Sequence, residues 1–125
     1  MKKLLMLAAL FEAGAGVILL ANPSIVVRLL FDVEIVGAGV IVSRLLGVAL
    51  MGLGAACWPG TDSRRGFYGM TTYGTLATLY LIYIGVRGGM IGVLLWPAVV
   101  VHAILVVLLV GARFREQTTP AAQIT

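Results

Sequence analysis

The sequence predicts an all-α integral membrane protein, a four-helix bundle that crosses the bilayer. Of its 125 residues, 61% are hydrophobic and only 11% are charged, and the mean hydropathy is +1.08. A soluble domain carries about twice that share of charged residues. The apolar residues form long continuous runs without the polar–apolar alternation of barrel strands. Because only helices and closed barrels satisfy every backbone group in lipid, these runs are predicted to be helices.

Four apolar windows come close to the ~20 residues that a helix needs to cross the hydrocarbon core. They cover residues 4–21, 40–58, 67–86 and 90–112, and together they form one membrane domain, 1–112. A polar break at 59–66 and a tight turn at 87–89 separate the later windows. The polar residues 113–125 are expected to form a cytoplasmic tail.

A short helix is expected between the first two spans. Asn22-Pro23-Ser24 interrupts the first window, and residues 25–31 are apolar around Arg28. Ser24 is a suitable N-cap for such a helix. We expect residues 25–31 to lie in the outer membrane interface.

The distribution of basic residues predicts that both termini are cytoplasmic. With the N-terminus inside, six Lys and Arg residues fall on the inner side and three on or near the outer side. Short cytoplasmic loops are enriched in Lys and Arg. The inner set is Lys2, Lys3, Arg64, Arg65, Arg113 and Arg115, and the outer set is Arg28, Arg44 and Arg87.

Three ionisable residues lie inside predicted spans, where each costs about 2.5–3.5 kcal/mol on insertion scales. At 1.5 Å per residue, Glu12 and His102 fall at a similar depth near the midplane, and Arg44 lies closer to the outer surface. Tyr73 and Tyr80 of the third span fall at neighbouring depths. The sequence therefore predicts a buried polar cluster of Glu12, Arg44, Tyr73, Tyr80 and His102.

Two interpretations of this cluster are open. A Glu12–Arg44 pair can fix the register of the helices and do nothing else. Alternatively, intramembrane charges mark a ligand, ion or proton site. We favour the structural interpretation.

Small and aromatic residues indicate how the helices pack and where they leave the membrane. Small residues four apart let helix backbones approach closely, and Trp and Tyr gather at membrane interfaces. The expected packing residues are Ala9, Ala13, Gly16, Gly47, Gly52 and Ala56, and the expected interface anchors are Trp58, Tyr68, Tyr83 and Trp96.

The sequence contains no motif for a catalytic site, a metal or a cofactor. Cys57 is the one cysteine and His102 the one histidine, which excludes a cysteine-rich zinc site and bis-histidine haem ligation within one chain. The net charge of +4 comes from scattered basic residues and does not form a nucleic-acid patch. The expected partners are the lipid bilayer and other membrane subunits or a second copy of the chain.

Several short motifs resemble a group of small four-helix bacterial membrane proteins that are loosely DoxX-like. The resemblance rests on residues 10–16, Asn22-Pro23-Ser24, residues 43–47, and Leu95-Trp96-Pro97 with His102. It implies a four-span fold in the bacterial plasma (inner) membrane. It carries no activity over to a residue of this chain.

Three functions are consistent with these features. The first is a non-enzymatic accessory or scaffold subunit of a membrane complex. The second is a proton- or ion-coupled small transporter that acts as a homodimer through Glu12, since small multidrug resistance transporters carry a Glu at a similar place in their first helix. The third is a quinone- or lipid-binding subunit of an electron-transfer assembly.

Overall fold

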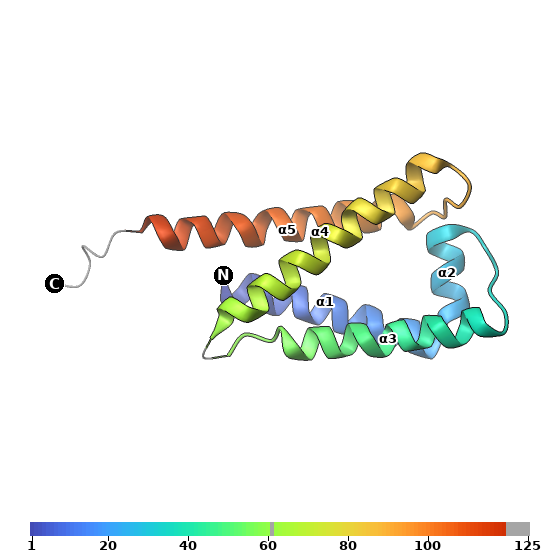
Figure 1. The fold of residues 1–125 in the computed structure, drawn as a ribbon, viewed down its shortest axis with the longest axis horizontal. Coiled ribbons are helices and arrows are strands. Elements are labelled where there is room, and N and C mark those ends of the chain that lie inside the picture. The colour runs from blue at the N-terminus through green and yellow to red at the C-terminus, as the bar shows by residue number, and fades with distance from the viewer. Residues whose placement is uncertain (61, 120–125) are drawn as a thin grey trace.

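A computed structural model describes residues 1–60 and 62–119, and over these residues the chain is entirely helical (Figure 1). Its five helices are α1 (Lys2–Ala21), α2 (Pro23–Phe31), α3 (Ala38–Ala56), α4 (Ser63–Arg87) and α5 (Leu95–Thr118). The four long helices run back and forth along the long axis of the molecule. The start of α1 and the end of α5 therefore lie on the same side.

Three helices, α1, α3 and α5, are long and apolar enough to cross a membrane. This confirms a helical protein with transmembrane helices. α4 has 25 residues and is long enough, but its Thr and Tyr side chains leave it less hydrophobic than the other three. A fourth span is therefore not established by hydropathy.

The long helices pack as two antiparallel pairs. α1 lies along α3, and α4 lies along α5, as Figure 1 shows. α1 is the central element because it contacts all four other helices. An apolar cluster, mainly from α1, α4 and α5, joins the two pairs; its buried members are Leu5, Ala8, Ala9, Cys57, Phe67, Met70 and Leu109.

The α1–α3 contact is so close that side chains are excluded from it. A Cβ atom at Gly16 would lie 2.6 Å from the Gly47 carbonyl oxygen, and one at Gly54 would lie 2.7 Å from the Ala9 carbonyl oxygen. Ala13 lies between these two crossings, and its Cβ atom would be 2.9 Å from the Cβ atom added at Gly54. Four of the expected packing residues, Ala9, Ala13, Gly16 and Gly47, therefore lie in this contact.

Two of the expected packing residues are not in this interface. A Cβ atom at Gly52 would meet nothing within 4 Å, and Ala56 is exposed. The contact residue is Gly54, because it follows Gly47 by seven residues and so returns to the same helix face. The four-residue step from Gly52 to Ala56 follows a face of α3 that points away from α1.

α2 crosses one end of the bundle at a steep angle to the long helices (Figure 1). It begins earlier than expected, since Pro23 occupies the first turn and the Asn22 side chain accepts a hydrogen bond from the Ile25 amide at 3.4 Å. Asn22 is therefore the N-cap, not Ser24. The helix ends at Phe31, and the C-cap residue Asp32 adopts a left-handed conformation with φ of 53°.

The loop between α4 and α5 docks on the end of α2. The Gly92 amide donates to the Leu30 carbonyl at 2.9 Å, and the Leu94 amide donates to the Leu29 carbonyl at 2.8 Å. These bonds satisfy carbonyls that a helix C-terminus leaves free. They also explain why α5 starts at Leu95 and not near residue 90, as the apolar window predicts.

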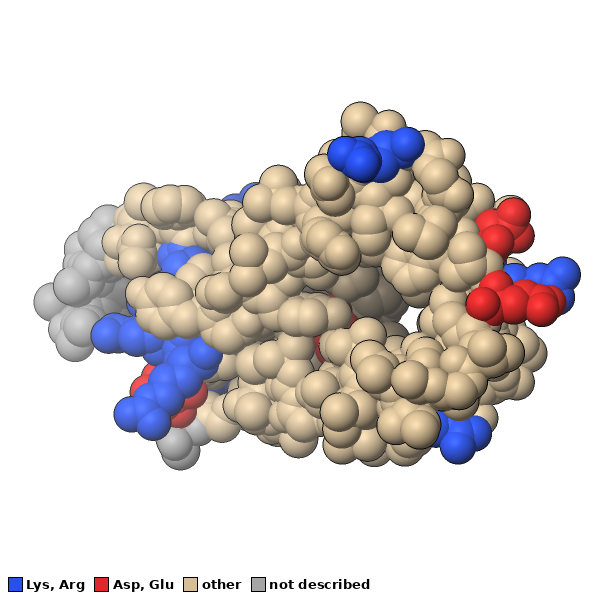
Figure 2. Space-filling view, turned by 45° about the vertical axis from the view of Figure 1, so that its right-hand side comes forward, with Lys and Arg blue, Asp and Glu red and all other residues tan. Residues whose placement is uncertain are grey.

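Beyond residue 112, α5 continues as a helix to Thr118. Residues 113–118 of the expected polar tail are thus the last turns of α5, and residues 120–125 lie outside the described part of the chain. The charges gather at the two ends of the molecule, with an almost uncharged band between them (Figure 2).

Candidate functional site

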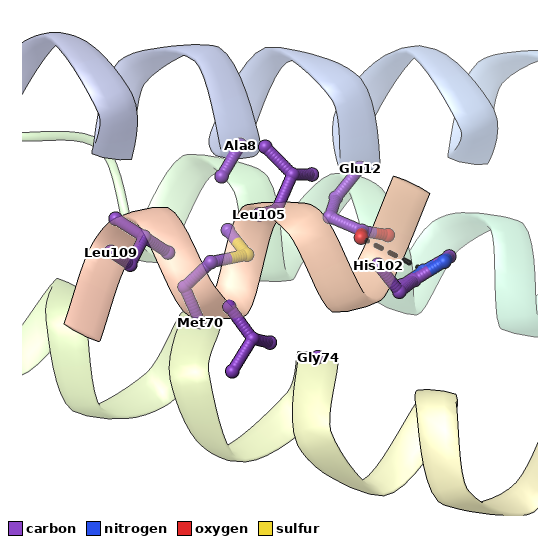
Figure 3. Close-up of a pocket in the computed structure, with 8 residues that line it drawn as sticks. Ala8, Glu12, Met70, Gly74, His102, Leu105 and Leu109 are labelled. Atoms are coloured by element: carbon purple, nitrogen blue, oxygen red, sulfur yellow. Dashed lines mark ion pairs between the residues drawn. The ribbon is translucent and has the colours of Figure 1, made fainter. Parts of the chain in front are cut away.

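The central polar feature is a contact between α1 and α5. Glu12 is only 2% exposed, and its Oε1 atom lies 3.3 Å from Nε2 of His102 (Figure 3). The two residues come from opposite helix pairs. The prediction that Glu12 and His102 lie at the same depth is confirmed by this distance.

The backbone fixes the protonation pattern of His102. Its Nδ1 atom lies 2.7 Å from the carbonyl oxygen of Ala98, one helical turn earlier. A carbonyl can only accept, so Nδ1 must carry a hydrogen. Nε2 then approaches Glu12 either as a second N–H donor of an imidazolium or as the acceptor from a protonated carboxyl group.

The Glu12–His102 contact therefore holds one shared proton. Without it, a carboxylate oxygen and a bare ring nitrogen would face each other as two acceptors. With it, the pair is neutral overall, whether the proton sits on Oε1 or on Nε2. Because the pair is neutral, burying Glu12 and His102 between apolar helices costs much less free energy than burying an isolated charge.

Aromatic rings enclose the histidine. The Phe11 ring meets the His102 ring edge-on, with centroids 5.7 Å apart, and the Tyr73 ring lies 6.2 Å away in a tilted arrangement. Tyr73 thus belongs to the cluster, as expected. Phe11 was not among the predicted site residues, although it directly precedes Glu12 in the sequence.

The other two expected members lie elsewhere. The Arg44 side chain is exposed, and among the described residues the one ion-pair partner of Glu12 is His102. Tyr80 is 64% exposed and stacks on Tyr83, with ring centroids 6.2 Å apart. The predicted Glu12–Arg44 pair is therefore replaced by a Glu12–His102 pair. Glu12 is turned toward α5, and the register that sets Gly16 opposite Gly47 puts Arg44 level with Leu19, seven residues along α1 from Glu12.

A very small cavity adjoins the pair. Its volume is about 10 Å³, and Figure 3 shows Met70 and Gly74 of α4 across from Glu12 and His102. A cavity needs roughly 10–15 Å³ to hold one water molecule. The site is thus wide enough for at most a single water. The cavity is narrow because α4 and α5 are in close contact at Gly74. A Cβ atom added at Gly74 would lie only 2.7 Å from Cγ2 of Val106.

A hollow is visible in the middle of the uncharged band, with acidic atoms inside it (Figure 2). Glu12 is the one acidic residue in the middle of a long helix; the other described acids lie near helix ends. Glu12 is only 2% exposed and the His102 side chain 11%, so the pair itself is almost completely buried.

The four expected interface anchors are all about half exposed. Trp58 and Tyr68 lie at the end where α3 stops and α4 begins, and Tyr83 and Trp96 lie at the opposite end. Trp96 also packs over Gly85, where an added Cβ atom would lie 2.8 Å from its ring.

No metal site is formed by the residues that the structure describes, since no three His, Cys, Asp or Glu side chains come together. Comparisons with protein-family models, curated proteins and solved structures find no match for this chain. The DoxX-like resemblance accordingly stays a prediction, and the function is argued from the site itself.

Proposed function

We propose that the chain is a non-enzymatic accessory or scaffold subunit of a membrane complex. The observation that carries this proposal is the enclosure of the Glu12–His102 pair. Its polar atoms satisfy one another, and the adjoining cavity of about 10 Å³ has no room for a substrate. The Glu12–His102 contact links α1 to α5, and it therefore stabilises the packing of the α1–α3 pair against the α4–α5 pair.

The proposal includes four spans with both termini in the cytoplasm of a bacterial inner membrane. α3 ends on the side of the molecule opposite to the start of α5, so α4 has to cross the same thickness to connect them. No charged residue falls between positions 67 and 86 of α4. The six-to-three excess of Lys and Arg at the end that carries both termini supports the orientation.

The alternative is a proton-coupled transporter that works as a homodimer. One observation favours it: the partner of Glu12 is a histidine that can take or release a proton, not a permanently charged arginine. A pair that shares one proton can in principle pass it on. This function requires a route for protons from the aqueous phase to Glu12, whose exposure is 2%.

Two measurements separate these functions. The first is the particle mass after extraction from the native membrane in mild detergent, where we expect a hetero-complex larger than a homodimer. The second is proton flux into liposomes that contain the purified chain and an internal pH dye, where we expect none above empty liposomes. A homodimer with a flux that Glu12→Gln abolishes would overturn the accessory role and establish transport.

The expected quinone- or lipid-binding role in electron transfer remains a prediction. Nothing in the geometry of the Glu12–His102 pair favours it.

A further inference from the structure

A second, larger depression lies on the outside of the α1–α3 pair. This groove has a volume of about 590 Å³, within the 300–1,000 Å³ typical of small-molecule sites. Its lining is apolar: Ala9, Leu10, Ala13, Gly14, Val17, Met51, Gly54, Ala55 and Trp58. It is separate from the Glu12–His102 pair, which faces α5.

The groove is deep because its floor is made of small residues. Gly14 and Gly54 carry no side chain, and Ala13 and Ala55 carry only a methyl group. The close approach of α1 and α3 removes bulk between them, and the larger side chains Leu10 and Met51 form the walls.

The length of the groove matches one leaflet of a bilayer. Gly16 lies opposite Gly47 and Ala9 opposite Gly54, and this antiparallel register places Trp58 level with Leu5. From that level to Val17 the groove runs twelve residues, about 18 Å at 1.5 Å per residue. Half of a hydrocarbon core is about 15 Å.

One end of the groove is basic. Lys2 and Lys3 follow within one further turn of α1, and the helical repeat of 3.6 residues puts them on the same face as Leu10 and Val17. Both lysines are exposed, and the half-exposed Trp58 ring lies just inside them. At the other end, Val17 lies mid-bilayer in an apolar surface.

We propose that this groove binds one anionic phospholipid, with an acyl chain along α1 and α3 and its phosphate against Lys2 and Lys3. An apolar channel of one-leaflet depth that ends in two cations and an indole N–H fits a lipid with a negative headgroup. A neutral lipid would gain nothing from the lysines. The inference uses only the membrane location of α1 and α3 and is independent of the accessory role.

The test is native mass spectrometry of the delipidated protein in detergent, titrated with phosphatidylglycerol or with phosphatidylcholine of identical acyl chains. We expect one tight phosphatidylglycerol adduct. Each basic residue near a phosphate contributes roughly fivefold to binding, so Lys2→Gln combined with Lys3→Gln should weaken that adduct about thirtyfold. The control Arg28→Gln, at the opposite end, should leave it unchanged.

A second pair of variants tests the groove. Gly14→Leu adds a side chain in the groove, Gly52→Leu adds one on a surface outside it, and at both positions the new Cβ atom meets nothing within 4 Å. Gly14→Leu should weaken the adduct several-fold, and Gly52→Leu should not.

Three results would overturn the proposal. The first is equal binding of the two lipids, and the second is binding that neither the double lysine variant nor Gly14→Leu reduces. The third is a protein dimer that Gly14→Leu converts to a monomer, because the groove would then hold a helix of a second copy and not a lipid.

Discussion

The crossing of α1 and α3 at Gly16 makes a quantitative prediction for the variant Gly16→Ala. The added Cβ atom would lie 2.6 Å from the Gly47 carbonyl oxygen and 2.9 Å from the Met51 amide nitrogen. The first distance is about 0.8 Å short of the 3.4 Å at which ordinary van der Waals contact begins. Both obstacles are backbone atoms, so the helices themselves have to move apart.

The cost of this movement can be isolated with a neighbouring glycine. Overpacking that shifts backbone costs about 1–3 kcal/mol. Replacing Gly by Ala inside a helix also gives up to about 1 kcal/mol in the favourable direction. Gly14→Ala receives the same helix gain and meets nothing within 4 Å. The stability difference between the two variants should therefore equal the packing cost alone, about 1–3 kcal/mol.

The assay is reversible unfolding of the purified protein in mixed micelles by added SDS, followed by far-UV circular dichroism. On α3 the same comparison is available between Gly47→Ala, whose Cβ atom would lie 2.7 Å from the Gly16 carbonyl oxygen, and Gly52→Ala, which is open. We expect the two interface variants to lose stability and the two open ones to keep it or gain. If Gly16→Ala is as stable as Gly14→Ala, or Gly52→Ala is as costly as Gly47→Ala, the described interface is wrong.

Three further predictions concern the links between the helix pairs and their topology. Glu12→Gln and His102→Leu should each lower the unfolding free energy by about 3–5 kcal/mol, and the double variant should lose much less than the sum because the pair is removed as a unit. The stability losses of Arg44→Leu and Glu12→Gln should instead add up in their double variant. A non-additive loss in that double variant would show that Glu12 pairs with Arg44 after all. Gly92→Ala should destabilise the protein measurably in the same assay, since its Cβ atom would collide with the Leu29 backbone, and a neutral result would remove the docking of the loop on α2. Reporter fusions at either terminus should indicate the cytoplasm and one in the α4–α5 loop the opposite side; equal signals at all three sites would exclude an α4 that crosses the membrane.

The sequence indicates how deep each polar residue lies along its helix, but it does not indicate toward which neighbouring helix the side chain points. Depth alone placed Glu12 beside His102, and the structure has them 3.3 Å apart. Depth also placed Arg44 within reach of Glu12, yet Glu12 is turned toward α5, and the α1–α3 register puts the exposed Arg44 level with Leu19, seven residues from Glu12.

The same ambiguity explains the packing glycines. Four-residue spacing identified small residues on α3 without identifying which face meets α1. The seven-residue spacing from Gly47 to Gly54 indicates the contacting face, because α1 has the same spacing between Ala9 and Gly16. The start of α5 could not be predicted from hydropathy, because hydrogen bonds from the Gly92 and Leu94 amides to α2 hold an apolar segment out of the helix.

The central position of α1 has a consequence for biogenesis. Chains are made at about 5–20 residues per second, so the 97 residues from Ala21 to Thr118 take about 5–20 s. α1 is thus in the membrane from the start, ready to receive each later helix in turn, since it contacts them all. Until α5 has been made and has inserted, Glu12 has no His102 to share a proton with, and an unpartnered ionisable group in lipid costs about 2.5–3.5 kcal/mol. α5 is made after α1 and supplies the partner of Glu12, so pairing with His102 favours the packing of α5 against α1.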